Sequence, residues 1–160
     1  MSAFFRPSSV PAVAHLLTEA GLPSSDITAA HLEHFLACGK SDAPDGVVGV
    51  ELYGLVALLR SLAVNPRCRG RGCGKALVAQ AEHHAQAQGA TDIYLLTTTA
   101  ERFFERLGYV RVKREAVPSA IQRTPEFAAL CPSSSIVMIK QLPANPTVER
   151  DAPQAARPSM

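Results

Sequence analysis

The sequence predicts one mixed α/β domain built on a single β-sheet, and three observations favour this class. The chain has 160 residues, which is the usual length of one domain. Hydrophobic residues make up 47% of it, enough for a core without disulfides or structural metals. Segments with strand and helix patterns alternate along the chain, and no internal repeat interrupts their order.

The first third of the chain is expected to contain a short strand and two helices. The strand covers residues 3–6, and a helix capped by Ser8 follows over residues 10–20, where apolar side chains recur at helical spacing. Gly and Pro residues end this helix. A second helix is expected to begin after residues 25–26 and to include Phe35.

Two strands separated by a turn are expected next. Residues 40–46 (KSDAPDG) predict a loop, and VVGVELYG predicts a strand that ends in a turn at Gly54. The run VALLRSLAV, Val56–Val64, is apolar and broken by one arginine, Arg60. Such a run is typical of a central strand that is covered on both faces.

The second half of the chain is expected to alternate helices with strands. A helix over residues 74–88 has an apolar stripe and a glycine stop. A strand over residues 92–99 precedes a short helix, for which Thr98 and Glu101 have capping-box spacing. The remaining expected elements are strands over residues 109–117 and 135–142, with a mixed segment over residues 118–130 between them.

The end of the chain differs in composition from the rest. Residues 143–160, PANPTVERDAPQAARPSM, are rich in Pro and Ala and predict a disordered tail. The folded domain is therefore expected to cover residues 1–142.

Charge, cysteine spacing and apolar runs argue against several classes of function. The formal net charge of +2 is too small to predict a nucleic-acid partner. The four cysteines form no CxxC pair and the histidines lack zinc-finger spacing, so we expect free thiols and no metal. No apolar run approaches the ~18 residues of a membrane span, and no signal-peptide core is visible. We expect a cytoplasmic protein without a membrane partner.

The stretch LAVNPRCRGRGCGKAL, residues 62–77, places glycines and basic residues between a strand and a helix. It is not a P-loop, because Ala76 follows GK where a hydroxyl residue is needed and Arg69 replaces the first glycine. It is not a GxGxxG dinucleotide motif, because the third glycine would fall at Lys75. The pattern that remains is RxxGxG over residues 69–74.

This pattern predicts a phosphate-binding loop. Consecutive backbone N–H groups would point into one concavity, and the N-terminus of the following helix adds roughly half a positive charge. Gly70, Gly72 and Gly74 would let a pyrophosphate approach the backbone, and Lys75 would add a direct charge. A basic, flexible loop with no ligand is the alternative interpretation.

In this context the loop resembles the acetyl-coenzyme A loop of the GNAT N-acetyltransferases, and FFERLGY, Phe103–Tyr109, is similar to a second motif of that family. The resemblance covers residues 3–142. It implies acetyl-CoA as cosubstrate and a mixed central sheet with helices on both faces. Its two central strands, Val56–Val64 and Asp92–Thr99, would splay apart to admit the cofactor.

The segments LLRSLAV, IYLLTTTAE and EFAALCPSSS are most similar to the arsenic-resistance N-acetyltransferases, which are thought to acetylate arsinothricin or related amino acids. The cofactor contacts implied by the family resemblance come from the splayed strand, the glycine loop and the short helix. They are Leu62, Ala63, Val64, Arg69, Gly70, Arg71, Gly72, Cys73, Gly74, Lys75, Thr98, Phe103 and Phe104.

Acetyl transfer to an amine requires a neutral amine, a donor for the carbonyl oxygen and a proton for the departing thiolate. The candidate base is Glu51, whose alternative role is a carboxylate paired with Arg60 or exposed to solvent. Many GNAT proteins carry a tyrosine in the short helix as the thiol's proton donor. Here Phe103 and Phe104 stand in its place, so the thiolate leaves unassisted or a threonine of residues 97–99 substitutes through a water.

Arg60 is the most informative residue outside the loop, because a buried guanidinium requires an anionic partner. One option is an internal salt bridge to Glu51. The other is a bidentate grip on the acid group of a substrate. The candidate substrate-binding residues are Arg60, Ser61, Thr97 and Thr99.

The sequence thus predicts an acetyl-CoA-dependent N-acetyltransferase for the amine of a small acidic amino acid, such as arsinothricin or a phosphinothricin-like compound. Two alternatives stay open. One is a different amine acceptor, such as a protein, a polyamine or an aminoglycoside, and the other is a catalytically silent CoA-binding protein. A homodimer is common among similar proteins and is also an expectation here.

Overall fold

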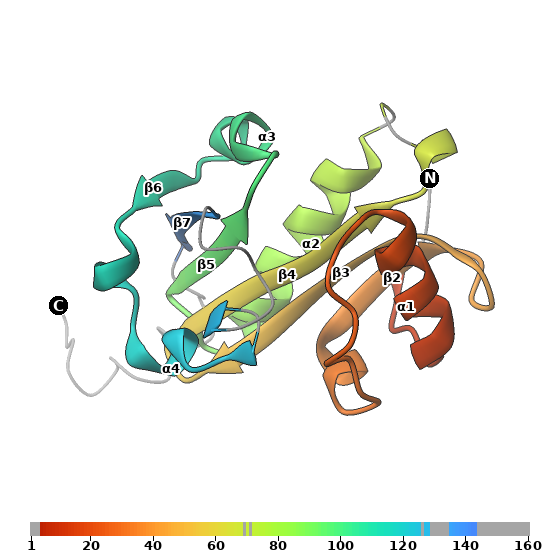
Figure 1. Ribbon diagram of the computed structural model, residues 1–160, viewed down its shortest axis with the longest axis horizontal. Coiled ribbons are helices and arrows are strands. Elements are labelled where there is room, and N and C mark those ends of the chain that lie inside the picture. The colour runs from red at the N-terminus through yellow and green to blue at the C-terminus, as the bar shows by residue number, and fades with distance from the viewer. Residues whose placement is uncertain (1–3, 69, 71, 126, 129–134, 144–160) are drawn as a thin grey trace, which may run out of the picture.

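The computed structural model describes residues 4–68, 70, 72–125, 127–128 and 135–143. Within these ranges the chain forms one sheet, whose strand order is β1-β2-β3-β4-β5-β7-β6 (Figure 1). The strands are β1 Phe4–Phe5, β2 Phe35–Gly39, β3 Pro44–Tyr53, β4 Val56–Val64, β5 Asp92–Thr97, β6 Val110–Val112 and β7 Ile136–Gln141. The α-helices are α1 Val10–Glu19, α2 Cys73–Ala87, α3 Glu101–Arg106 and α4 Ser119–Gln122. Short 3-10 turns, η1 to η3, cover His31–His34, Pro66–Cys68 and Arg114–Ala116.

The two central strands of the sheet pair over only part of their length. β4 and β5 are parallel, whereas the other neighbouring strands are antiparallel. Their register runs from Val56 opposite Asp92 to Leu58 opposite Tyr94 and ends there, although both strands continue. The sheet therefore opens into two arms beyond Leu58. This opening is the splay that the family resemblance implied.

A bulge in β4 lies where the arms separate. Val47 pairs with Ala63 and Gly49 pairs with Arg60, so two steps along β3 match three along β4. Ser61 is in the extra step and has a φ of 61°, a left-handed conformation that is uncommon for a residue other than glycine. The bulge turns the second half of β4 away from β5.

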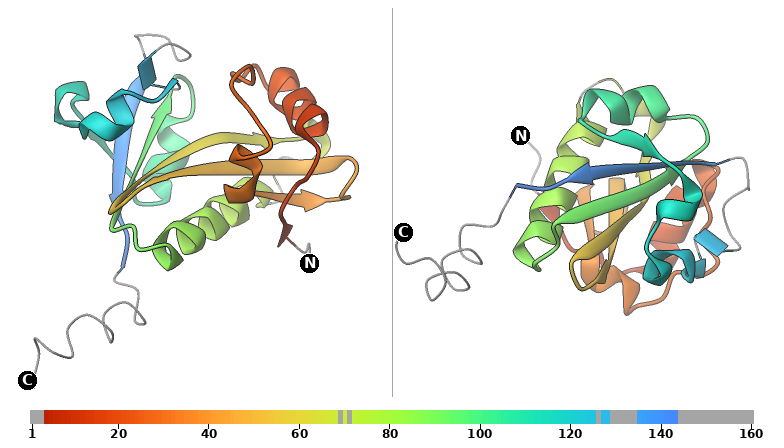
Figure 2. Two further views of the ribbon diagram at one scale, coloured as in Figure 1. Left: turned by 90° about the horizontal axis from the view of Figure 1, so that it is seen from below. Right: turned by 90° about the vertical axis from the view of Figure 1, so that its left-hand side faces the viewer.

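Helices cover both faces of the sheet, as Figure 2 shows: α2 lies on one face, and α1 and α4 lie on the other. The face under α2 carries the largest buried cluster, which extends from β2 to β7 and includes Leu77, Ile93 and Phe104. The opposite face carries two separate clusters. One joins α1 to β2, β3 and β4, and the other joins α4 to β4, β5 and β7. The gap between these two clusters coincides with the splay.

The predicted second helix, beginning after residues 25–26, is wrong: residues 25–30 contain turns and no α-helix. Phe35 begins β2, and only His31–His34 form a single 3-10 turn. The Phe35 side chain is fully buried against Gly49, where an added Cβ would lie 2.3 Å from the ring. An inner strand with this packing stabilises Phe35 more than a helix would, and the local sequence pattern did not reveal its packing partner, Gly49.

Several element boundaries also differ from the prediction. Ser9 rather than Ser8 caps α1, by accepting a hydrogen bond from the Ala12 N–H at 3.1 Å. The predicted loop over residues 40–46 is shorter, because β3 already begins at Pro44. The strand expected over residues 109–117 is limited to Val110–Val112, and a 3-10 turn follows.

The predicted tail over residues 143–160 lies, apart from Pro143, outside the described residues, so its disorder stays a prediction. The 1–142 domain boundary stays a prediction for the same reason. Among the described helices, none combines the length and apolar character that crossing a bilayer requires.

Candidate active site

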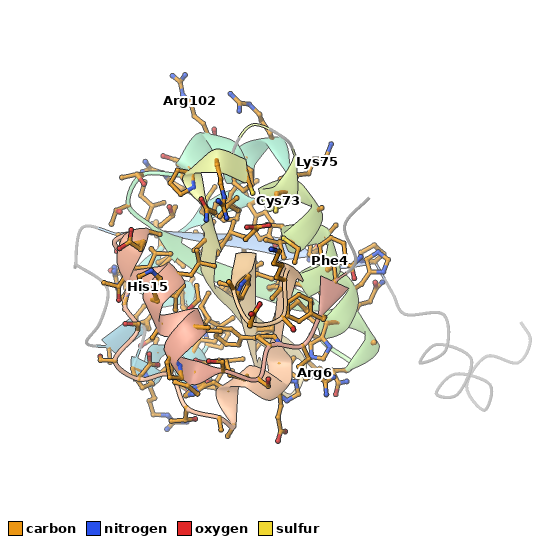
Figure 3. The ribbon with its side chains drawn as sticks, turned by 90° about the vertical axis from the view of Figure 1, so that its right-hand side faces the viewer. Phe4, Arg6, His15, Cys73, Lys75 and Arg102 are labelled. Carbon is orange, nitrogen blue, oxygen red and sulfur yellow. The ribbon has the colours of Figure 1, made fainter. Side chains whose placement is uncertain are left out.

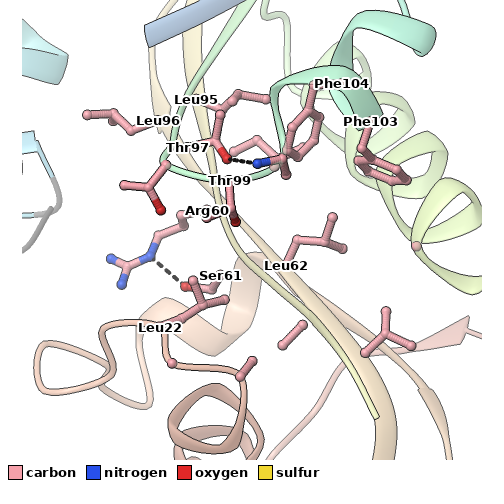
Figure 4. Close-up of a pocket in the computed structure, with 18 of the residues that line it drawn as sticks. Leu22, Arg60, Ser61, Leu62, Leu95, Leu96, Thr97, Thr99, Phe103 and Phe104 are labelled. Carbon is pink, nitrogen blue, oxygen red and sulfur yellow. Dashed lines mark hydrogen bonds between the residues drawn. The ribbon is translucent and has the colours of Figure 1, made fainter. Parts of the chain in front are cut away.

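A cleft of about 1160 Å³ occupies the splay between the two arms of the sheet. Figure 4 shows Arg60, Ser61 and Leu62 of β4 on one side of it and Leu95, Leu96 and Thr97 of β5 on the other. The remaining walls come from the end of α1 and its following loop, the glycine loop, and the start of α3. The two apolar strands and the glycine loop that the sequence predicted thus line the same cavity.

The glycine loop forms the wall at the N-terminus of α2. Gly70 and Gly72 have φ values of 81° and 78°, a region that favours glycine. A Cβ added at either position would meet no atom within 4 Å, so the space beside this backbone is open. Gly72 is the N-cap of α2 and provides no side-chain cap for the first N–H groups of the helix. The loop therefore presents unpaired donors and the positive end of a 15-residue helix to the cleft.

Basic side chains gather at the same end of the molecule. Lys75 lines the cleft, and Figure 3 shows it and Arg102 extending outward near Cys73. Arg69 and Arg71, which the sequence analysis assigned to the same site, lie outside the described residues. Gly74 packs against Phe103, whose ring an added Cβ would approach to 3.4 Å.

The edge of β4 that faces β5 lines the middle of the cleft. Leu62, Ala63 and Val64 all border the cavity, and the β4–β5 register ends before them, at Leu58. On its other edge β4 still pairs with β3, through Ala63 and Val64. An extended ligand between the arms would therefore meet strand backbone at this edge.

The start of α3 lines the cleft with aromatic rings and no phenolic hydroxyl. Phe103 and Phe104 both border the cavity, and Phe104 stacks edge-on against Tyr109 at 5.5 Å between ring centroids. The Tyr109 hydroxyl donates to Glu82 at 2.9 Å, and burial raises the pKa of this phenol. Tyr109 is thus committed to the core on the α2 side.

The three threonines at the end of β5, residues 97–99, do not form the predicted capping box. Thr97 accepts a hydrogen bond from the Ala100 N–H at 2.9 Å, and α3 begins at Glu101 with Ala100 as N-cap. The capping box of Thr98 with Glu101 is therefore wrong. Thr98 and Thr99 line the cleft with exposed side chains.

Arg60 lies at the inner end of the cleft, in a buried ionic cluster. Its guanidinium holds Asp26 in a fork, with Nη1 to Oδ2 at 2.6 Å and Nη2 to Oδ1 at 2.8 Å. The same group donates to Glu51 at 2.7 Å and to the Ser61 hydroxyl at 2.9 Å. The hydrogen bond from Arg60 lowers the pKa of Asp26 more than burial raises it. The internal salt bridge to Glu51, one of the two options for Arg60, is present.

Glu51 faces away from the cleft. It lines a separate hollow of about 220 Å³ beside His31 and Tyr53. Its carboxylate accepts hydrogen bonds from Arg60 and from the Tyr53 hydroxyl. The pKa of Tyr53 is raised, mainly by burial and secondly by its hydrogen bond to Glu51. Its role as the base stays a prediction.

The same cluster has the composition of a cation site. Asp26, His31 and Glu51 place potential ligand atoms within 4.8 Å of one another. However, the Arg60 guanidinium already lies against both carboxylates and provides the positive charge there. The guanidinium thus supplies one positive charge against the two carboxylates, at the place where a cation would contact both.

Comparison with known proteins identifies the family. The model of the "Acetyltransferase (GNAT) domain" matches residues 31–111. An uncharacterized N-acetyltransferase of Chlorobaculum tepidum is 30% identical over 117 residues, which cover 70% of this chain and 73% of that protein. The chain belongs to the GNAT acetyltransferase family. The predicted enzyme class, an acetyltransferase, and its cosubstrate, acetyl-CoA, are confirmed at the level of this family.

Two more comparisons concern an amino-acid acetyltransferase and an N-acetylglutamate synthase. The amino-acid acetyltransferase of Ectopseudomonas mendocina is 37% identical over 71 residues, which are 44% of this chain and 15% of that protein. The structure of N-acetylglutamate synthase from Neisseria gonorrhoeae with coenzyme A and N-acetyl-glutamate superposes with a TM-score of 0.77. It is 18% identical and covers 89% of this chain, which spans 35% of the synthase, so this likeness shows the fold.

A protein of Mycobacterium tuberculosis in complex with CoA and NLQ matches over its whole length. Its TM-score is 0.74 at 20% identity, with 88% of this chain and 99% of that chain covered. The mixed GNAT sheet with two splayed central strands is thus confirmed as the fold.

The GNAT cleft of this chain fits the diphosphate and pantetheine arm of coenzyme A. Open space beside two glycines in left-handed conformation, an uncapped helix N-terminus and a lysine suit a diphosphate. The open edge of β4 suits an extended arm that bears amides. The fit rests on backbone, which explains why glycine spacing was the most informative feature of the sequence.

Three features of the GNAT cleft were missed in the sequence analysis. Asp26 was placed at a helix start, and its spatial link to Arg60 has no local signal. The loop over residues 20–25 and the lone Ser135 also line the cleft. Each comes from an element distant in sequence, so only the tertiary structure brings them to the site.

Proposed function

We propose that this protein transfers the acetyl group of acetyl-CoA to the amine of a small acidic amino acid, with arsinothricin or a phosphinothricin-like compound as the candidate acceptor. The observation that carries the proposal is the composition of the cleft wall. Among its described residues, the charged side chains are Arg60 and Lys75, and no carboxylate lines it. A wall of this kind suits ligands that bear acid groups.

The cofactor half of the proposed site is the glycine loop, the β4 edge and α3. Acetyl-CoA supplies a thioester whose acetyl group passes to the amine. We assign its binding to the residues named from the sequence: Leu62, Ala63, Val64, Arg69, Gly70, Arg71, Gly72, Cys73, Gly74, Lys75, Thr98, Phe103 and Phe104. Of these, all but Arg69 and Arg71 are described and line one cleft.

The acceptor half of the proposed site lies at the inner end of the cleft, near Arg60, Ser61, Thr97 and Thr99. The two amino-acid acetyltransferases among the comparisons support an amino acid as acceptor. Because Arg60 is already paired with Asp26 and Glu51, its grip on a substrate acid requires that acid to replace the Asp26 carboxylate. The hydroxyl groups of Thr98 and Thr99 could bind a substrate acid without displacing Asp26.

The proposed chemistry places few demands on protein acids and bases. No histidine, carboxylate or tyrosine side chain lines the described part of the cleft. We therefore propose that the amine loses its proton to water and that the alignment of amine and thioester supplies most of the acceleration. A thiolate with a thiol pKa near ~8.5 is a fair leaving group without an acid.

The same wall composition favours one alternative, a CoA-binding protein without catalysis. Phe103 and Phe104 stand where a tyrosine would provide the proton. The second alternative is a different amine acceptor, such as a protein, a polyamine or an aminoglycoside. A polycationic acceptor is disfavoured, because no described carboxylate lines the cleft to bind its charge.

Turnover of the purified protein decides between these functions. Acetyl-CoA is incubated with arsinothricin, phosphinothricin, glutamate, spermidine or an aminoglycoside, and acetylated product is measured by mass spectrometry. We expect product with the acids and none with the polycations. Tight CoA binding by calorimetry without product from any amine would establish the silent protein instead.

A further inference from the structure

Ser135 is a buried hydroxyl residue of the cleft that has no hydrogen-bond partner among the described residues. It immediately precedes β7, whose first residue, Ile136, pairs with Thr97. Ser135 is 7% exposed and lines the cleft, yet its Oγ has no hydrogen-bond partner in the described part of the chain. Buried hydroxyl groups are normally paired, so this one calls for an explanation.

The other buried hydroxyls show that the fold satisfies such groups. Thr124 is 3% exposed, and its hydroxyl donates to the Ile121 carbonyl at 2.7 Å and accepts from the Phe127 N–H at 3.2 Å. The Ser61 hydroxyl accepts from Arg60. Ser135 thus differs from both, because it lines the cleft without a hydrogen-bond partner among the described residues.

The position of Ser135 favours the acceptor over the cofactor. The strand order is β4-β5-β7, and the glycine loop follows β4. Ser135 therefore approaches the cleft from the arm that does not carry the glycine loop. Thr97, which pairs with the next residue, Ile136, also lines the cleft, as do Leu96 and Thr98 beside it.

We propose that Ser135 binds the acceptor: its hydroxyl donates a hydrogen bond to an oxygen of the acid group of the acceptor amino acid. This inference rests on the function proposed above. A hydroxyl pairs with a carboxylate or phosphinate oxygen without a competing charge, and no described carboxylate lines the cleft to repel that oxygen. The acceptor thereby satisfies the one buried side-chain hydroxyl that lacks a partner among the described residues.

The proposal predicts opposite effects of one substitution on stability and on function. Ser135→Ala removes a hydroxyl that is unpaired in the free protein, so the Tm should stay equal or rise by about 2–4 °C. The KM for the acid acceptor should rise about tenfold or more, because a hydrogen bond to a charged group is lost. The Kd for CoA, measured by calorimetry, should not change. Ser135→Thr retains the hydroxyl and should restore part of the acceptor affinity.

Thr124→Val is the matched control, because it removes a buried hydroxyl that is paired and outside the cleft. It should lower the Tm and leave the KM unchanged. An unchanged KM in Ser135→Ala beside an active wild type would overturn the Ser135 proposal alone, and so would a weakened Kd for CoA. No product from any acid with wild-type protein would overturn the proposed function, and the Ser135 proposal with it.

Discussion

Removing the guanidinium of Arg60 should lower the stability of the protein much more than removing that of an exposed arginine. In Arg60→Met the side chain keeps most of its length, but Asp26 and Glu51 lose their shared counter-charge. Their side chains are only 12% and 9% exposed, so water does not replace the lost donors well. Two buried carboxylates would then face each other without compensation.

The size of the effect follows from the burial of the cluster. Removing one partner of a buried ion pair costs about 3–5 kcal/mol, because the remaining charge is left uncompensated. For a chain of this size 1 kcal/mol corresponds to about 2–4 °C, so the Tm should fall by about 6–20 °C. Arg111→Met is the control, since Arg111 forms an equally short ion pair with Glu101 at 2.7 Å but is 64% exposed. Its loss should change the Tm little.

Far-UV circular dichroism in urea measures this difference, because the chain contains no tryptophan for fluorescence. The pH dependence adds a second signature, through Asp26→Asn. Arg60 lowers the pKa of Asp26 below its usual 3.8, so the stability from this pair is complete above about pH 4. The gap between wild type and Asp26→Asn should therefore shrink as the pH falls below 3.8 through the folded-state pKa.

Equal losses of stability in Arg60→Met and Arg111→Met would refute this reasoning. Arg60→Lys separates the structural role from a grip on the substrate. If the cluster is structural, the lysine variant should lose stability, because it cannot reproduce the fork on Asp26, and should keep its acceptor KM. A raised KM with unchanged stability would show that Arg60 binds the substrate acid.

Three further predictions concern the cleft and its surroundings. Gly72→Ala should weaken CoA binding by about tenfold or more in calorimetry, whereas Gly54→Ala, with a similar φ of 69° and open space outside the cleft, should cost similar stability and leave CoA binding intact. Iodoacetamide should modify Cys73, which lines the cleft, before Cys38, whose pKa burial raises to about 12, and peptide mapping should show that CoA protects Cys73. Glu51→Gln should lower kcat by less than about 100-fold, since Glu51 does not line the cleft, and a larger loss across the pH profile would instead establish it as the base.

The position of the glycine loop beside the cleft was predictable because its signal is local. A loop that must bring its backbone close to a ligand has closely spaced glycines in the sequence. Gly70 and Gly72 adopt a left-handed conformation, which favours glycine. The central strand Val56–Val64 matched its prediction at both ends, because a strand buried on both faces forms a mostly apolar run, here broken by Arg60 and Ser61.

The tertiary contacts of Asp26 and the position of Ser135 were not predictable for the opposite reason. Asp26, Arg60 and Ser135 come from a loop, a central strand and the start of the last strand. Nothing in their local sequence indicates that the first two form a fork or that the third lacks a partner. Phe35 was placed in a helix for a similar reason, because the cavity that it fills at Gly49 lies on another strand.

The ionic cluster around Arg60 stabilises the bulge in β4. A buried ion pair is weak evidence for stability, since apolar side chains of similar volume often stabilise a core as well or better. Arg60, however, also donates to Ser61, the residue that the bulge holds in a left-handed conformation. Strain of this kind persists only where surrounding contacts fix it, and here Asp26 and Glu51 fix the arginine that fixes the serine. The cluster thus stabilises the one irregularity of β4 that turns its edge away from β5. The same contacts that hold the core together keep the cleft open.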